Sequence, residues 1–528
     1  MSYLNNLKKE ASKTRTMNGA RTYSTSSDAC LDLFAVAGGM RGKSEKELVR
    51  LFDRAYIENP ELAMKLLFYI RDIRGGLGER DIFRTLIRHV AKTWRDSARK
   101  NVALIAEYGR YDDLLCLMGT PAQKEVVRVI SARLAEDVKA LDSCAQAESH
   151  AQDESLDATH ACNAAAPHNA AAPRISLLAK WMPSINASSP RTRGQAKILA
   201  QALGLKEADY RKLLSRLRAA ISLTECRLTS RKVDKINYAA VPAGALLKYR
   251  SAFARHDGER FGEYLVDVLE GEKEIHSDTL YPYDLVRPFM KTRSFSWLGG
   301  EMSADISGED VLDLMWDHLG GDVAGRNAIS VIDTSGSMYW TRRGSITPAL
   351  VSQSLGLYFA ERCRGTFHNM FITFESHPHL IEIHGKTLRD KLRYIQTAPW
   401  GGSTDLEAVF DLILRAAVEA DAPQEDMPAT LYIISDMEFN VAMENPDKSI
   451  YEAAKEKFEA SGYAMPAVVF QNVNSWQMQT PVRAHTRGTA LASGAGTNNF
   501  KYKFDGNITP MDHMLRVLNG PRYAAVHA

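Results

Sequence analysis

Oxygen-bearing side chains gather in three short stretches of the C-terminal third of the chain. In SVIDTSGSM, Asp333 follows an apolar run and precedes the hydroxyls of Ser335 and Ser337. WGGSTDLE carries Thr404 at the start of an amphipathic segment, and LYIISDMEF places Asp436 after another apolar run. Hydroxyls, few carboxylates and room for water suit the octahedral shell of Mg²⁺. The five residues therefore predict a site for Mg²⁺ or another hard divalent cation.

The same residue types argue against other kinds of site. No soft ligand lies near these stretches, which argues against zinc or copper, and the six cysteines include no CxxC pair. An aspartic protease also has an Asp-Thr-hydroxyl sequence, but its chemistry needs a second such loop, and the chain has none. No nucleophile with its base and no second cluster of metal-binding carboxylates is apparent. The sequence therefore favours a binding protein over an enzyme.

Alternation of apolar and amphipathic segments indicates how the three stretches would meet. Short apolar runs alternate with segments of helical period in the C-terminal part, and the runs are 328–333, 370–374, 430–436 and 466–473. This alternation predicts an open, mostly parallel sheet with helices on both faces, similar to a Rossmann-like α/β fold. Ligands of such sheets bind at the carboxyl ends of the strands, where Asp333 and Asp436 are expected. The pattern begins after Gly320 and Gly321, which places the domain boundary near 320–327.

The preceding part of the chain is predicted to be all-α. Apolar residues recur at helical spacing from about 44 to 142 and again from about 175 to 317. Successive helices of this length resemble a HEAT-like solenoid. Residues 143–173 are rich in Ala, His and Pro, a composition that buries no core, so we expect a mobile insertion there. The predicted organisation is a helical domain over 1–322 and an α/β domain over 325–528.

Charge is distributed unevenly along the chain. The whole sequence carries 66 Lys and Arg against 64 Asp and Glu, yet residues 174–255 hold 17 basic and 4 acidic side chains. The following stretch, 256–322, holds 5 basic and 16 acidic ones. A segment this basic is typical of a surface that binds a polyanion, although two oppositely charged segments can also neutralise each other.

Within the basic segment, charged residues alternate with Tyr249 and Phe253, a pattern that suits phosphate contact and base stacking on looped or single-stranded RNA. The alternative is an ordinary solvated helix face. His256 has no second His and Lys in a shared motif, so a helix-end role is preferred to RNA cleavage. The candidate RNA-binding residues are Arg191, Arg193, Lys197, Arg211, Lys212, Arg216, Arg218, Arg227, Arg231, Lys232, Lys235, Lys248, Arg250 and Arg255.

Both parts of the chain resemble known families. VIDTSGSM, GGSTDL and LYIISDM are similar to the three loops of the metal-ion-dependent adhesion site of von Willebrand A domains, and the resemblance covers about 325–528, with 486–496 similar to the last strand of that fold. It implies that the five residues named above contact the metal. INYAAVPAGALLKYRSAFARHD, at 236–257, resembles the best-marked segment of the TROVE module of the Ro ribonucleoprotein family. That family also has the order TROVE, then von Willebrand A.

The second resemblance implies a ring of helical repeats closed by the A domain, with structured noncoding RNA bound outside and RNA 3′ ends in the centre. RDIRGGLGERD is closer to another branch with this two-part layout, and the 143–173 insertion is foreign to the Ro pattern. We expect a non-enzymatic RNA-binding scaffold whose partners are noncoding RNA and an RNA-processing exonuclease. The alternative is a protein–protein adaptor or cofactor-insertion helper whose ion recruits a carboxylate-bearing partner without RNA.

Composition is compatible with these expectations. The chain has 528 residues, which suits two or more domains, and its 45% hydrophobic and 25% charged residues are ordinary for a soluble protein. The sequence begins with the polar, basic stretch MSYLNNLKKEASKTRT and has no apolar run of about 18 residues. We therefore expect a reduced, cytoplasmic protein that makes no membrane contact.

Overall fold

The computed structural model describes residues 3–151, 175–221, 223–277, 279–290, 308–321, 323, 327–340, 346–441 and 448–528. The chain forms two compact units. Unit 1 combines Met1–Leu86 with Ser277–Val526, and unit 2 combines Ile87–His276 with His527–Ala528. The first change of unit falls within helix α5 (Arg80–Thr93).

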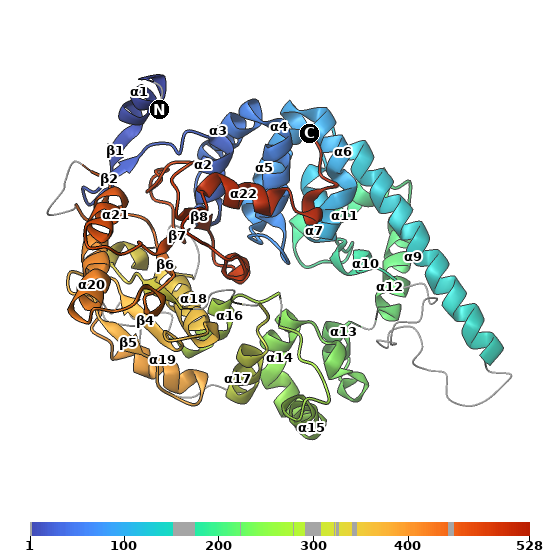
Figure 1. Ribbon diagram of the computed structural model, residues 1–528. Helices are drawn as coiled ribbons and strands as arrows, with labels where there is room; N and C mark the ends of the chain where they lie inside the picture. The colour runs from blue at the N-terminus through green and yellow to red at the C-terminus, as the bar shows by residue number, and fades with distance from the viewer. Residues whose placement is uncertain are drawn as a thin grey trace. The chain divides into compact units, whose positions relative to one another are not determined.

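A six-stranded sheet lies at the core of unit 1 (Figure 1). Its strand order is β5-β4-β3-β6-β7-β8, and all neighbouring strands are parallel except β4 and β5. Every residue of β3, β6, β7 and β8 is buried, as expected for strands covered on both faces. The strands are β3 (Ala328–Ile332), β4 (Met370–Thr373), β5 (Leu380–Glu382), β6 (Thr430–Ser435), β7 (Ala467–Asn472) and β8 (Thr489–Ser493). The predicted combination of helical parts with a mostly parallel sheet is thus confirmed.

Helices from the C-terminal part of unit 1 cover this sheet. Helix α18 (Pro348–Arg362) packs against β3, β4 and β6, and every residue from Pro348 to Ala360 is buried. Thr347 caps its start by accepting a hydrogen bond from the Leu350 amide over 3.3 Å. The remaining helices are α16 (Pro282–Val286), α17 (Glu309–Asp317), α19 (Leu388–Gln396), α20 (Leu406–Glu419), α21 (Ile450–Ala460) and α22 (Pro510–Leu518).

The N-terminal segment of unit 1 packs on the same sheet. Every residue of α2 is buried, and this helix contacts β8 and α22. The approach is close at Gly38, where a Cβ atom would lie 2.3 Å from the Cα atom of Gly494. The sequence assigned this segment to a helical domain over 1–322, whereas its buried face joins it to the sheet. Its elements are α1 (Tyr3–Ser12), β1 (Lys13–Arg15), β2 (Arg21–Tyr23), α2 (Ala29–Val36), α3 (Glu45–Glu58) and α4 (Pro60–Arg71).

The described residues of unit 2 form helices and turns and contain no strand. An aromatic cluster packs where the Tyr238 ring meets Phe253 and Phe261, at centroid distances of 5.2 and 4.9 Å. The helices are α6 (Arg95–Asn101), α7 (Ile105–Tyr108), α8 (Tyr111–Leu114), α9 (Gln123–Ala151), α10 (Leu178–Trp181), α11 (Pro190–Ala202), α12 (Glu207–Ala220), α13 (Thr224–Thr229), α14 (Ala243–His256) and α15 (Gly258–Leu269).

The end of helix α9 differs from the prediction for residues 143–151. It continues to Ala151, so residues 143–151 are helical, although the sequence predicted a mobile loop from 143. Alanine, glutamate and glutamine, which are common in this stretch, have high helix propensity, and this explains the extension. The rest of the predicted insertion, 152–173, lies outside the described residues. None of the described helices combines the length and the apolar character needed to span a membrane.

Candidate functional site

Asp333 and Asp436 stand at the carboxyl ends of adjacent parallel strands. They follow β3 and β6 directly, and Ile332 of β3 lies opposite Ile434 of β6. The Asp333 amide donates to the Ile434 carbonyl over 3.2 Å, which continues the pairing of the two strands to the first aspartate. Asp333 is fully buried, and Asp436 is 2% exposed. Two carboxylates therefore share one buried edge of the sheet.

The loop after β3 brings two serine hydroxyls to these carboxylates. The Ser335 amide donates to Asp333 Oδ1 over 2.8 Å, which folds the loop back over the strand end. The Oγ atoms of Ser335 and Ser337 lie 3.2 Å apart, and the Ser337 hydroxyl lies near enough to Asp436 to lower the pKa of its carboxyl. A hydroxyl outside the predicted set, that of Ser435, donates to Asp333 Oδ2 over 2.5 Å. Four of the five predicted ligands thus form one connected group, which we call the carboxylate cluster: Asp333, Ser335, Ser337 and Asp436.

The carboxylate cluster holds negative charge where burial disfavours it. Burial and the neighbouring Asp436 raise the pKa of Asp333 to about 7. Burial also raises the pKa of Asp436, against the lowering effect of the nearby Ser337 hydroxyl. Asp436 Oδ2 is buried and has no hydrogen-bond partner in the described chain. A cation would neutralise both carboxylates and coordinate this oxygen, so the donor set fits a hard divalent ion.

The carboxylate cluster differs from metal sites built mainly from ionisable ligands. In the part of the chain that the structure describes, no group of three or more His, Cys, Asp or Glu side chains is arranged to hold a metal. Two carboxylates and two hydroxyls would leave several positions of an octahedral shell to water or to another ligand.

Thr404 lies beside the carboxylate cluster with different partners. Its hydroxyl donates to the Glu438 carbonyl over 2.7 Å and lies 3.2 Å from Asn440 Oδ1. Both partners belong to the loop that follows Asp436. Among the described residues, no hydrogen bond joins Thr404 to either aspartate of the cluster. The structure therefore places this predicted ligand at the edge of the cluster and ties its hydroxyl to the loop 437–441.

The turn between β1 and β2 packs against that loop through residues that the sequence did not single out. The Met17 amide donates to Glu438 Oε2 over 2.7 Å. The Asn18 side-chain amide donates to the Glu438 carbonyl over 2.6 Å and lies 3.4 Å from the Thr404 hydroxyl. Burial and the charge of Asp436 raise the pKa of Glu438. In the sequence, Glu438 stands out as an acidic residue two positions after Asp436. No motif marks Asn18 as its partner.

Six of the predicted RNA-binding residues have partners within unit 2. Arg193, Arg218 and Arg250 donate to backbone carbonyls, Lys197 and Arg216 form ion pairs, and Lys248 lies over the Tyr249 ring. For the other eight, the described structure shows no side-chain hydrogen bond or ion pair; these unpaired cations are Arg191, Arg211, Lys212, Arg227, Arg231, Lys232, Lys235 and Arg255. All eight are exposed except Arg227, which is half-buried.

The aromatic residues of this segment only partly match the prediction. Phe253 is 0% exposed and packs against Tyr238 and Phe261, so the expectation that it stacks on a base is wrong. Its position on the inner face of α14 explains this, since residues at helical spacing share the face that builds the core. Tyr249 is half-buried. His256 lies in the last turn of α14, the helix-end position that the sequence predicted.

Comparisons with known proteins relate the whole chain to other sequences. The chain is 27% identical over 539 residues to "Uncharacterized protein L728" of Acanthamoeba polyphaga mimivirus, with 95% of this chain and 86% of that protein covered. It is also similar to the crystal structure of the Deinococcus radiodurans Ro (RSR) protein, at 15% identity and a TM-score of 0.37, over 90% of this chain and 92% of the other.

Two family descriptions divide the chain between them. Residues 327–514 match the family described as Domain of unknown function (DUF7788). Residues 16–123 and 122–326 match Domain of unknown function (DUF2828). The two matches to DUF2828 together span more than half of the sequence. The chain therefore belongs to the DUF2828 family.

Proposed function

We propose that this protein is a non-enzymatic RNA-binding scaffold, with RNA on unit 2 and Mg²⁺ in the carboxylate cluster of unit 1. The observation that carries the proposal is the set of eight unpaired cations between residues 191 and 255. The resemblance of 236–257 to the TROVE module supports RNA as the polyanion. When bound, Mg²⁺ would supply an electrophilic centre for a ligand oxygen.

The unpaired cations are available to an outside polyanion, because the chain supplies few acids near them. Residues 174–255 contain 17 basic and 4 acidic side chains. In the described structure, acidic residues of the next stretch pair with other cations: Asp257 with Arg260, Asp267 with Lys273 and Glu309 with Arg389. These contacts therefore do not support the alternative in which residues 174–255 and 256–322 neutralise each other. An RNA backbone would neutralise the remaining charge.

The placement of the unpaired cations favours contact with phosphates over contact with bases. Arg211 and Lys212 lie on α12, and Arg231, Lys232 and Lys235 follow α13. Phe253, the nearby aromatic ring expected to stack, is buried. Phosphate contacts position an RNA without reading its sequence. We therefore infer recognition of a folded RNA by its backbone, as for other proteins that read RNA shape.

If the unpaired cations contact RNA phosphates, the binding constant for RNA should depend on salt concentration in a predictable way. The logarithm of the binding constant for a labelled RNA should fall linearly with the logarithm of salt concentration, by about 0.7 per phosphate neutralised on single strands. Replacing Arg227, Arg231 and Lys235 together by Gln should flatten this slope by roughly two units. Fluorescence anisotropy with an RNA hairpin and with a single strand measures both slopes.

A matched control uses exposed cations of unit 1. Lys46, Lys386 and Arg487 are exposed and form no side-chain hydrogen bond or ion pair in the described structure. Replacing these three by Gln changes the net charge equally and should leave the slope within error of the wild type. A wild-type protein without salt-dependent RNA binding would overturn the proposal, as would equal flattening by both triple variants.

A second candidate function follows from the carboxylate cluster. Asp436 Oδ2 lacks a hydrogen-bond partner, and a cation with two protein carboxylates keeps affinity for a third. The protein would then be an adaptor that recruits a carboxylate-bearing partner, without RNA. Capture of such a partner should require Mg²⁺, disappear in EDTA and survive ribonuclease treatment. Under the RNA proposal, ribonuclease abolishes capture of partners that arrive bound to RNA.

A further inference from the structure

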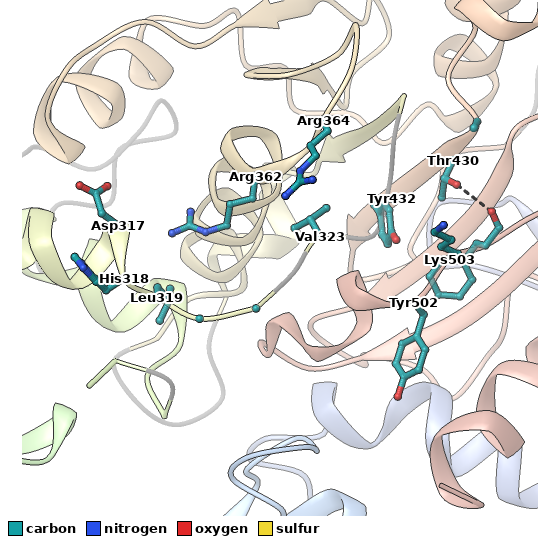
Figure 2. A pocket seen from close by; sticks show the side chains of 14 residues that line it. Asp317, His318, Leu319, Val323, Arg362, Arg364, Thr430, Tyr432, Tyr502 and Lys503 are labelled. Atoms are coloured by element: carbon teal, nitrogen blue, oxygen red, sulfur yellow. Dashed lines mark hydrogen bonds between the residues drawn. The ribbon is translucent and has the colours of Figure 1, made fainter. Parts of the chain in front are cut away.

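A cavity of about 900 Å³ opens at the opposite end of β6 from Asp436 (Figure 2). Thr430, the first residue of β6, lines it together with residues from the ends of α17 and α18 and from 502–504. Strand β6 has six residues, each of which adds about 3.3 Å, so the cavity lies about 20 Å from the carboxylate cluster. The cavity is therefore separate from the candidate cation site.

Most of the charged residues that line this cavity are basic. Arg362, Arg364 and Lys503 contribute cationic side chains, and Asp317 is the one acidic residue of the lining in the part of the chain that the structure describes. In Figure 2, Arg362 and Arg364 extend from the end of α18, while Lys503 lies beyond them near Tyr432. Like charges around one cavity repel each other, and an anion inside it would relieve this repulsion.

One of the three cations is held in place, and two are available. The Arg362 guanidinium donates to the Trp316 carbonyl over 2.5 Å and lies over the Tyr358 ring, 4.2 Å from its centre. For Arg364 and Lys503, the described chain offers no side-chain hydrogen bond or ion pair, and both are exposed. An oriented arginine beside two unpaired cations suits an anion with several oxygens, because guanidinium and ammonium groups both recognise phosphate.

Three aromatic residues, Tyr432, Tyr502 and Phe504, also line the cavity. Tyr502 is half-buried, and burial raises the pKa of its hydroxyl, which stays protonated and able to donate at neutral pH. Phe504 and Tyr432 are buried beside it and form an apolar wall. The Thr430 hydroxyl donates to the Phe504 carbonyl over 3.4 Å, so its proton is already used. The cavity thus offers Arg362 and Arg364 on one side, and Lys503 among ring surfaces on the other.

We propose that this cavity binds a phosphate-bearing small molecule of nucleotide size. Its phosphates would contact Arg364 and Lys503, and its ring would lie against Tyr502. The cavity volume falls within the range of about 300–1,000 Å³ that is usual for small-molecule sites. The inference goes beyond the proposed function, because it requires neither Mg²⁺ in the carboxylate cluster nor RNA on unit 2.

Calorimetric titration of the full chain with ATP, pyrophosphate, inorganic phosphate and adenosine tests the proposal. EDTA is present throughout, so that the carboxylate cluster cannot recruit phosphate through a metal. We expect ATP to bind more tightly than pyrophosphate, pyrophosphate more tightly than phosphate, and adenosine more weakly than ATP. Arg364→Gln and Lys503→Gln should each weaken ATP binding about tenfold or more, as expected when a charge-assisted hydrogen bond is lost.

Matched variants separate the cavity from general surface charge. Lys386→Gln removes an exposed, unpaired cation outside the lining and should leave ATP affinity unchanged. Arg364 and Lys503 are exposed, so their variants should keep the wild-type circular dichroism spectrum and unfolding midpoint, and the RNA salt slope of unit 2 should not change. Failure of the wild type to bind ATP, or equal ATP affinity of wild type and an Arg364→Gln/Lys503→Gln double variant, would overturn the proposal. Adenosine binding as tight as that of ATP would do the same.

Discussion

Asp333 and Asp436 show why a buried pair of like charges is informative. Each carboxylate is desolvated, and Asp436 adds to the rise in the pKa of Asp333. In EDTA, Asp436→Asn should raise the free energy of unfolding, since it removes one of two buried negative charges. Mg²⁺ should stabilise the wild type, by about 2.7 kcal/mol at a concentration one hundred times Kd, and should leave the variant unchanged. Urea unfolding with EDTA or with Mg²⁺ measures both effects.

Two further variants make this result specific. Asp426 is exposed, so Asp426→Asn should change neither the stability in EDTA nor the response to Mg²⁺. Thr404→Ala should reduce the Mg²⁺ response less than Asp333→Ala does, because the Thr404 hydroxyl already donates to the Glu438 carbonyl and water can replace it as a ligand. A Mg²⁺ response of Asp436→Asn equal to that of the wild type would show that the ion binds elsewhere.

At the scale of elements, the turn between β1 and β2 depends on a few contacts with the loop after Asp436. Asn18→Ala removes the 2.6 Å hydrogen bond to the Glu438 carbonyl and the 3.4 Å contact with Thr404. A loss of about 1–2 kcal/mol should increase opening of the hairpin about 5- to 30-fold. Brief trypsin digestion should therefore cleave after Arg15 and Arg21 correspondingly faster.

Met17→Ala is the matched control for this hairpin. The Met17 side chain is 64% exposed, and only its backbone amide binds Glu438, so the substitution keeps the hydrogen bond. Its cleavage rate should equal that of the wild type. If Asn18→Ala is also cleaved at the wild-type rate, the side chain of Asn18 does not hold the hairpin closed.

The same contacts show which elements sequence can predict. β3 and β6 were predictable because each is a continuous apolar run, and Asp333 and Asp436 follow from their positions at the strand ends. The individual hydrogen bonds of the hairpin were not predictable, because residues 17 and 438 are 421 positions apart and neither carries a local sign of the other. Helical periodicity indicated α14, yet it could not show that Phe253 faces the core and not the solvent.

At the scale of the whole molecule, unit 1 is built from two segments that are far apart in the sequence, and this determines what can fold alone. The segment 325–528, predicted as a domain, lacks residues 1–86, whose Phe34 is 0% exposed and whose Phe34 carbonyl accepts a hydrogen bond from Ser493 over 2.8 Å. It also lacks Asp72, which pairs with Arg522 over 2.5 Å. Without these partners, the outer face of β8 and α22 would be exposed to water.

Residues 325–528 produced alone should therefore bind a hydrophobic dye and unfold without a cooperative transition. Each large apolar side chain left uncovered costs about 1.5–3 kcal/mol, and a few such losses approach the whole stability of a typical domain. Joining residues 1–86 through a flexible linker to residues 277–528, which supply the rest of unit 1, should restore a cooperative transition in urea, whereas a linker-only fusion to 325–528 should not. If the isolated fragment unfolds cooperatively and binds no dye, the N-terminal segment is dispensable for the sheet, and the predicted boundary near 320–327 describes an independent domain after all.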